Sequence, residues 1–339
     1  MAFLVVLFSS IYYLKGIVMR NIFSCRLKII LLIVVAIVVT IFYLLYQLPN
    51  RWQYALMHRS LSLLAIIVTG TAIALSTMLF QALVNNRILT PSVLGLDSLY
   101  LFIQTAIIFF SGSATLFAID SIGLFFFSSA VMLLFALVLY QLLFRQEQQN
   151  MFFLLLVGIV FGTLFQSMTT FMEVLIDPNE FQISQDIGFA SFNRINTNIL
   201  WIAIIMIVAI SLFSIRYFSV LDVLSLGRDQ AINLGVNYQR ITKQLLIIVT
   251  LLISVATALV GPITFLGLLV MNITFEFMPK YQHRWLIPTS ILIAIIVLVL
   301  GQFIVAQLLT FKTTLSILVN FIGGVYFIYL LLRTNKQWQ

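Results

Sequence analysis

Ionisable side chains inside apolar stretches are the groups that would bind a driving ion, and this sequence has almost none of them. Asp97, Glu173 and Glu276 lie near the ends of apolar runs. A proton pump or an ion-coupled carrier usually has such residues at mid-membrane depth, so the sequence argues against both. Hydrogen bonds between helices are the simpler interpretation of the polar residues in the apolar centres, and substrate contact is the alternative. These residues are Gln81, Gln166, Thr169, Thr170, Asn272, Gln302 and Gln307.

Motifs for nucleotide or metal chemistry are also missing from the sequence. There is no GxxxxGK[ST] loop, so the chain does not hydrolyse ATP in that way by itself. Cys25 is the single cysteine, which excludes an internal disulfide framework and a multi-cysteine metal site. We therefore expect no catalytic residue, no metal site and no cofactor. The energy for any transport must therefore enter from elsewhere.

The composition of the chain is that of a protein embedded in a lipid bilayer. Of 339 residues, 62% are hydrophobic and 8% are charged, and the mean hydropathy is +1.15. A soluble domain carries about 25% charged residues. A helix needs about 20 apolar residues to cross the bilayer, and continuous rather than alternating runs exclude barrel strands. We predict an all-α integral membrane protein with ten crossings, near residues 28–47, 60–84, 92–110, 122–144, 151–176, 197–217, 243–260, 263–278, 286–309 and 314–333.

The distribution of basic residues predicts the orientation. In a soluble protein 18 Lys and Arg against 10 Asp and Glu would suggest a nucleic-acid partner, but here the charges lie in short loops between apolar runs. If both termini are cytoplasmic, the outside loops keep only Arg51, Arg59, Arg194 and Lys312. The inside loops then hold Lys15, Arg20, Arg26, Lys28, Arg87, Arg145, Arg216, Arg228, Arg240, Lys243, Lys280, Arg284, Arg333 and Lys336. This asymmetry favours cytoplasmic termini and an even number of crossings.

Three regions are expected along the chain: a cytoplasmic segment over residues 1–27, a ten-helix transmembrane domain over 28–333 and a cytoplasmic tail over 334–339. The apolar run in residues 1–18 is too short to span, and no small-residue cleavage site follows it, which argues against a signal peptide. It is either an interfacial segment or an extension before a natural start at Met19; the second interpretation is preferred.

A polar stretch, LSLGRDQAINLGVNYQRITK at residues 224–243, interrupts the apolar pattern on the predicted cytoplasmic side. Asp222 and Ser225 are able to cap a helix, and Gly227 and Gly235 punctuate the segment. The pattern predicts two short helices at roughly a right angle. It fits an amphipathic connector and a docking surface for a soluble ATPase subunit equally well.

The same stretch closely resembles the coupling-helix loop of FecCD-like permeases, the ten-helix subunits of ABC importers for iron chelates and cobalamin. GPITFLGLL (residues 261–269) is similar to the GPIxFxGL signature of that family. QHRWLIP (282–288) resembles its DHRxLLP, and FIGGVYFIYLLLR (321–333) its closing IGxPxFxYLL. The resemblance covers nearly the whole chain after residue 28. NNRILTPSVLGLDSLY (85–100) is similar to the branch associated with ferric catecholate-type siderophores, whose members commonly pair with a second, related permease.

The departures from the family pattern are local. The Pro-His pair of the family is Met271 and Asn272 here, its following Arg is Phe275, and its proline near the last helix is Val325. The LPxG before that helix reads TTLS at residues 313–316. Roles of the missing histidine and arginine therefore do not transfer to this chain.

The resemblance implies a permease subunit of an ATP-driven importer that moves ferric siderophore into the cytoplasm of a bacterium. Its implied partners are ABC ATPase subunits, a second permease that is either a related protein or a second copy of this chain, an extracytoplasmic siderophore-binding protein, ferric siderophore and the bilayer, with no nucleic acid. The implied binding-protein docking residues are Arg51, Arg59 and Lys312. The implied ATPase-coupling residues are Asp222, Leu226, Gly227, Asp229, Ala231, Leu234, Gly235 and Val236.

Gln166, Thr169 and Thr170 on the fifth predicted helix are the candidates for lining the pathway, beside Gly158 and Gly162. Close helix packing is the alternative role of these glycines. Three other functions remain open: a cobalamin or haem importer of the same family, an ion-coupled secondary carrier, and a membrane-embedded assembly or sensor subunit.

Overall fold

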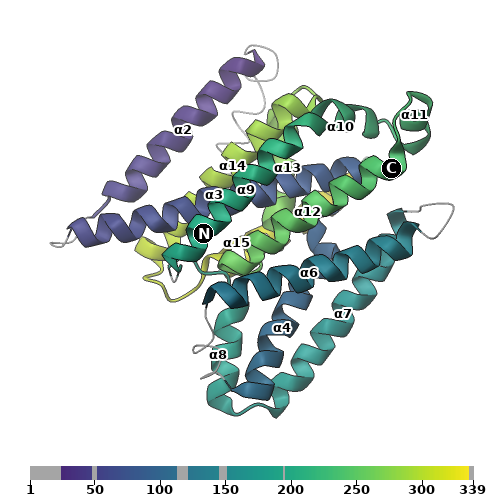
Figure 1. Ribbon diagram of the computed structural model, residues 1–339. Coiled ribbons are helices and arrows are strands. Elements are labelled where there is room, and N and C mark those ends of the chain that lie inside the picture. The colour runs from purple at the N-terminus through teal and green to yellow at the C-terminus, as the bar shows by residue number, and fades with distance from the viewer. Residues whose placement is uncertain (1–23, 48–51, 113–120, 145–150, 194, 336–339) are drawn as a thin grey trace.

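The computed structural model describes residues 24–47, 52–112, 121–144, 151–193 and 195–335, and these fold into helices and connecting turns (Figure 1). The predicted all-α fold class is confirmed for this part of the chain. Residues 1–18, Met19 and Arg51 lie outside it. The helices are α2 (Cys25–Leu45), α3 (Trp52–Val84), the 3-10 helix η1 (Pro91–Leu94), α4 (Leu96–Ser111), α6 (Ser121–Phe144), α7 (Met151–Leu175), α8 (Pro178–Gly188), α9 (Thr197–Ser214), η2 (Ile215–Tyr217), α10 (Phe218–Leu224), α11 (Arg228–Asn233), α12 (Tyr238–Val260), α13 (Leu266–Phe277), α14 (His283–Phe303), the π-helix η3 (Ile304–Leu308) and α15 (Leu315–Asn335).

Seven of the described helical segments are long and apolar enough to cross a bilayer. They are Cys25–Leu45, Trp52–Val84, Ser121–Gln141, Phe153–Leu175, Thr197–Leu224, Tyr238–Val260 and His283–Leu308. The other three predicted crossings coincide with shorter apolar helices, at Leu96–Ser111, Leu266–Phe277 and Leu315–Ile328. The 12 residues of α13 rise only about 18 Å, less than a hydrocarbon core of about 30 Å. Ten crossings therefore remain a prediction.

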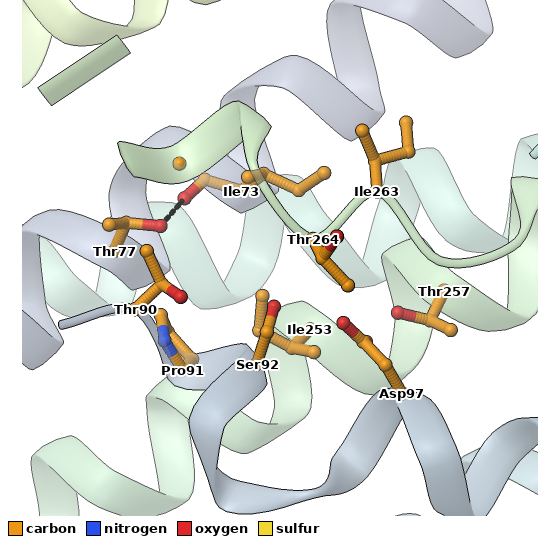
Figure 2. Close-up of a pocket in the computed structure, with 11 residues that line it drawn as sticks. Ile73, Thr77, Thr90, Pro91, Ser92, Asp97, Ile253, Thr257, Ile263 and Thr264 are labelled. Carbon is orange, nitrogen blue, oxygen red and sulfur yellow. Dashed lines mark hydrogen bonds between the residues drawn. The ribbon is translucent and has the colours of Figure 1, made fainter. Parts of the chain in front are cut away.

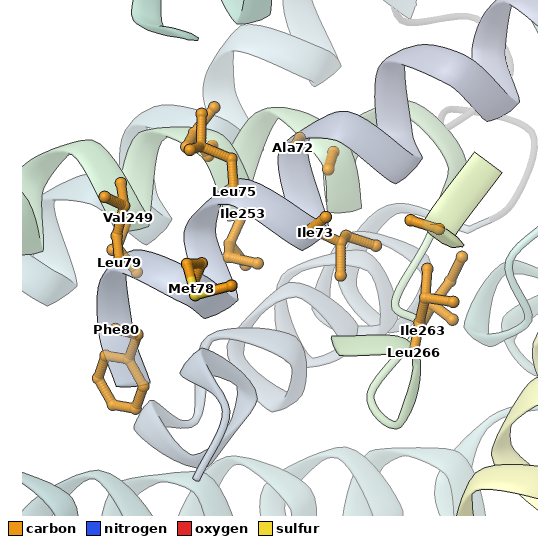
Figure 3. Close-up of a cluster of buried hydrophobic side chains, with 14 of the residues drawn as sticks. Ala72, Ile73, Leu75, Met78, Leu79, Phe80, Val249, Ile253, Ile263 and Leu266 are labelled. Carbon is orange, nitrogen blue, oxygen red and sulfur yellow. The ribbon is translucent and has the colours of Figure 1, made fainter. Parts of the chain in front are cut away.

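Helix α3 forms the centre of the bundle because it is apolar on all sides and rich in small residues. In its most apolar window 78% of the residues are buried, against 17% for α2. Without water between helices, small side chains allow the close backbone approach that stabilises membrane bundles. Ala72, Leu75 and Leu79 belong to the buried cluster that α3 shares with Val249 of α12 and neighbouring residues (Figure 3). The exposed apolar face of α2 is left for lipid or another subunit.

Two helical features depart from the sequence prediction. The second predicted helix begins at Trp52 rather than near residue 60, because a helix can extend past the apolar run once its polar residues find partners. Helix α8 was not predicted at all, although its first residues carry a recognisable start signal. Asp177 is its N-cap residue, Pro178 stands at the first helical position and Glu180 lies in the first turn.

The two glycines of α7 pack against η1 and the start of α4, which supports the packing interpretation for them. A Cβ atom at Gly158 would lie 2.9 Å from the Cα of Leu94, and one at Gly162 would lie 3.1 Å from the Cα of Gly95. Gly95 itself has φ +78°, which side chains disfavour. These contacts fix α7 beside α4, so the opposite, exposed face of α7 is the one available to other partners.

Segments that the sequence assigns to the cytoplasmic side lie together at one end of the bundle. The Lys28 ammonium in α2 donates a hydrogen bond of 3.1 Å to the carbonyl of Phe277, the last residue of α13. The Arg87 guanidinium, which follows α3, lies 4.6 Å from the ring centroid of Phe275. Cations at a helix C-terminus complement its dipole. These contacts support the predicted alternation of crossings.

Candidate functional site

The coupling segment, residues 222–243, includes the end of the short helix α10, the whole of the short helix α11 and the start of α12. The right angle and the cytoplasmic position predicted for its short helices stay predictions. Helix α10 ends at Leu224 and α11 spans Arg228–Asn233. Gly227 and Gly235 lie after them with φ of +104° and +82°, and no atom lies within 4 Å of a Cβ built at either. Glycine is therefore needed at these two positions for its backbone conformation and not for lack of space, because residues with a side chain rarely adopt a positive φ. Asn237 then caps α12 by accepting from the Arg240 amide.

The surface of this segment is apolar in part, although the segment is polar overall. Leu226, Ile232 and Leu234 are 54%, 45% and 63% exposed. Ala231 is fully buried and anchors α11 to its surroundings. Arg228 and Asp229 lie between these aliphatic residues in the sequence, and the Arg228 Nη1 is 3.7 Å from the Asp229 Oδ1. Exposed aliphatic side chains on a polar segment are typical of a protein-binding surface.

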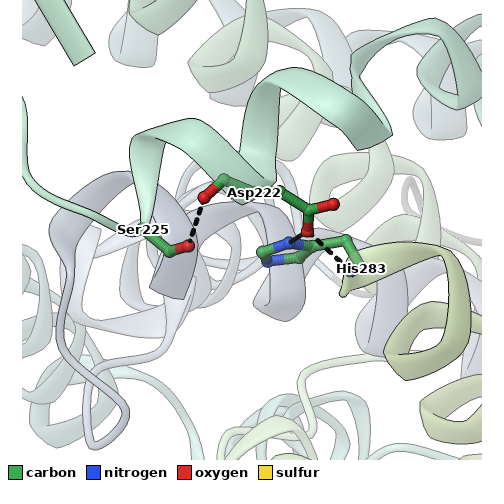
Figure 4. Close-up of polar contacts among 3 residues, drawn as sticks. All are labelled: Asp222, Ser225 and His283. Carbon is green, nitrogen blue, oxygen red and sulfur yellow. Dashed lines mark hydrogen bonds and ion pairs between the residues drawn. The ribbon is translucent and has the colours of Figure 1, made fainter. Parts of the chain in front are cut away.

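Asp222 holds the coupling segment to a distant helix, a contact that the sequence did not reveal. Its Oδ1 accepts a hydrogen bond of 2.8 Å from the backbone N–H of His283, the first residue of α14. The His283 Nδ1 lies 2.6 Å from the same oxygen (Figure 4). Asp222 therefore caps α14 rather than the adjacent short helix. Ser225 donates locally, to the Asp222 carbonyl.

The basic residues expected to dock a binding protein have different surroundings. Arg59 lies inside α3, where its Nη1 donates to the carbonyls of Tyr43, Leu44 and Tyr46 at 2.8–3.2 Å. Arg59 thereby satisfies carbonyl groups at the C-terminal end of α2. Lys312 is exposed in the turn between η3 and α15.

The turn before Lys312 has an unusual backbone. Thr310 and Phe311 have φ of +45° and +57°. Positive φ at consecutive non-glycine residues is uncommon and marks a segment whose surroundings impose its shape. Leu308 and Phe311 are also exposed, so an apolar surface lies next to the Lys312 charge.

Two of the three candidate pathway residues share the exposed face of α7. Gln166 and Thr170 are exposed, whereas Thr169 is buried at 3% exposure and donates to the Phe165 carbonyl. The Thr170 hydroxyl donates to the Gln166 carbonyl, which satisfies it even in lipid. The Gln166 amide has no such internal partner within the described residues, and lipid supplies none.

The position of Asp97 near the end of an apolar run suggested that it lies at the membrane surface, but the structure places it elsewhere. It is 7% exposed, in the first turn of α4, where that helix begins inside the bundle. The expectation that no carboxylate lies deep in the bundle therefore does not hold at this position.

These helices define a multi-pass helical membrane protein. The model of the FecCD transport family matches residues 26–333, and the chain belongs to this family. The resemblance seen in the motifs is thereby confirmed. The chain is a transport component of the bacterial cytoplasmic membrane with no catalytic role of its own.

Two relatives and one solved structure show how close the similarity is. The petrobactin import system permease protein YclO of Bacillus subtilis (strain 168) is 55% identical over 320 residues, covering 94% of this chain and 100% of the relative. The petrobactin import system permease protein FatC of Bacillus anthracis is 35% identical, covering 81% and 78%. A metal-chelate type ABC transporter in an inward-facing conformation has the same fold, with a TM-score of 0.79 at 20% identity, covering 90% of this chain and 98% of that one.

Proposed function

We propose that this chain is one of two permease subunits of an ATP-driven importer for a ferric siderophore, with ten crossings and both termini in the cytoplasm. Its regions are those expected from the sequence, a permease domain over residues 28–333 between two cytoplasmic ends. The observation that carries the proposal is the coupling segment, whose exposed Leu226, Ile232 and Leu234 offer a docking surface outside the apolar helices. Petrobactin, the cargo in the names of two relatives, is the first compound to test.

The mechanism follows from the position of the coupling segment. ATPase subunits bind its exposed aliphatic residues, and ATP-driven closure moves the segment. The Asp222–His283 contact passes this movement to α14, which packs on α3 at the centre of the bundle. The second permease, a related protein rather than a copy, completes the passage between the subunits. Gln166 and Thr170 line it, since the Gln166 amide is better satisfied by water than by lipid.

Reconstituted vesicles test the function directly. With this chain, its permease partner and the ATPase, uptake of ferric petrobactin is expected only when ATP, Mg²⁺ and the binding protein are all supplied. An uncoupler alone should leave the uptake rate unchanged. Vesicles without the ATPase are the control. Uptake in that control which stops when the ion gradient is collapsed would replace the importer by a secondary carrier, and cobalamin or haem uptake in place of petrobactin would change the cargo.

Lys312 is the charge that we assign to binding-protein docking on the outer face. Its exposure and the neighbouring exposed Leu308 and Phe311 support this assignment. The Nη1 of Arg59 is already engaged with the end of α2, so we assign Arg59 to holding that helix in place. For Arg51 the docking role rests on the sequence alone.

Lys312→Glu should weaken binding-protein docking roughly two- to fivefold, the range for one exposed charge pair. It should also make the remaining affinity less sensitive to salt, because interprotein charge pairs are screened over about 8–10 Å. Binding titrations at two salt concentrations measure both effects. Lys280→Glu, an exposed lysine assigned to the opposite face, is the matched control. Equal affinities for both variants would assign Lys312 to lipid headgroups instead.

A further inference from the structure

A small cavity lies where α3, η1, α4, α12 and the turn before α13 meet (Figure 2). Its volume of about 10 Å³ suits one water-sized particle. Oxygen-bearing side chains reach it from every one of these elements, and none of its lining residues is Lys, Arg or His. The polar lining residues are Thr77, Thr90, Ser92, Asp97, Thr257 and Thr264.

The Asp97 carboxylate is the charged group of this cavity. Its side chain is more than nine-tenths buried, and within the described residues its Oδ2 has no hydrogen-bond partner. The hydroxyls of Ser92 and Thr257 flank the carboxylate (Figure 2). The first turn of α4 also favours a negative charge, because the N-terminal end of a helix is electropositive. The Oδ2 of Asp97 therefore needs either a proton or a cation as its partner.

Two hydroxyls of the cavity, those of Thr77 and Thr264, donate their protons to groups other than Asp97. Thr77 donates to the Ile73 carbonyl at 2.7 Å, and Thr264 donates to the Asn320 side chain at 3.2 Å. Each of these oxygens consequently presents lone pairs, not a proton, to the cavity. Thr77, Thr264 and Asp97 all line the cavity, so a positive charge inside it would be attracted to the lone pairs of the two hydroxyls and to the Oδ2 of Asp97.

We propose that this cavity is a binding site for a single sodium ion, held by Asp97 and the surrounding hydroxyl oxygens. Oxygen ligands suit hard cations. One carboxylate balances one positive charge, whereas a divalent ion would leave a net charge buried in a medium of low dielectric constant. The ion joins four separate elements beside the turn that leads into α13. It is a structural ion of the permease, and its binding does not depend on which cargo the importer carries.

Binding of ²²Na⁺ and thermal unfolding of the full chain, purified in detergent with its partner subunits, test the site. At constant ionic strength, NaCl in place of choline chloride should raise the melting temperature by about 2–4 °C, the shift expected when a ligand well above its Kd binds only the folded state. KCl should give a smaller shift. About one ²²Na⁺ should bind per permease chain. Asp97→Asn, which keeps the shape of the side chain, should lose both effects, and Thr257→Val should weaken them.

Asp177→Asn is the matched control, because that carboxylate is exposed and makes no side-chain cap hydrogen bond. It should retain the sodium shift of the unmodified protein. Equal melting temperatures in sodium, potassium and choline salts, with no bound ²²Na⁺, would overturn the proposal and leave Asp97 as a protonated carboxyl. A sodium shift that persists in Asp97→Asn would overturn it as well. Neither readout requires transport, so failure here is separate from failure of the importer proposal.

Discussion

Gly235→Pro is expected to abolish substrate-stimulated ATP hydrolysis while the membrane helices stay folded. Gly235 has φ +82°, and proline fixes φ near −65°. The substitution also removes the hydrogen bond of 2.9 Å from the Gly235 amide to the Ile232 carbonyl. Together these changes cost roughly 3 kcal/mol or more, so the native turn would be populated about a hundredfold less.

A graded series at the same position separates conformation from bulk. No atom lies within 4 Å of a Cβ at Gly235, so side-chain volume alone is tolerated there. Gly235→Asn should remain close to the unmodified protein, because asparagine adopts positive φ more readily than other side chains. Gly235→Ala should fall between the two. The measurement is ATP hydrolysis by the reconstituted complex with and without loaded binding protein. Full stimulation in Gly235→Pro would show that the ATPase docks elsewhere.

The sequence predicted what depends on local pattern. Within the described residues, seven of the predicted apolar runs coincide with helices long enough to cross a bilayer and three with shorter apolar helices. The glycines of the coupling segment lie just after its short helices. These features follow from hydropathy and from the conformational freedom of glycine, which neighbouring residues determine. The start of α8 had a local signal too, in Asp177 and Pro178, but a search for apolar runs passes over so polar a helix.

The features that the sequence did not predict depend on residues far apart in the chain. Arg59 was assigned to a loop, and its partners in α2 become apparent only when two helices lie side by side. Asp97 stands near the end of an apolar run, but that helix begins inside the bundle, among residues of α3 and α12. The position of Asp97 along the apolar run was therefore a poor guide to its depth in the helix bundle. Hydropathy reports how apolar a segment is and not where its ends lie.

Replacement of Asp222 is the second change with a large expected effect, because its carboxylate accepts the only two described side-chain hydrogen bonds between α10 and α14. Asp222→Ala leaves two donors of the buried His283 without their partner, at a cost of about 1–3 kcal/mol for each unsatisfied group. The movement of α10 would then reach α14 only through the packing of the two helices, without the hydrogen bonds that join them. We expect ATP hydrolysis to continue while petrobactin uptake per ATP falls by about tenfold or more, the factor that corresponds to 1.4 kcal/mol.

A double-mutant cycle with His283→Ala distinguishes this joint from a general loss of stability. His283→Ala removes the contact with Nδ1 and keeps the backbone N–H, so its defect should be smaller than that of Asp222→Ala. Residues in direct contact are coupled, and the double variant should therefore be less impaired than the sum of the two single effects. Uptake per ATP is measured for all four proteins, with the melting temperature alongside. Additive losses of uptake, or losses that track the melting temperature alone, would mean that Asp222 stabilises the fold without transmitting the movement of the coupling segment.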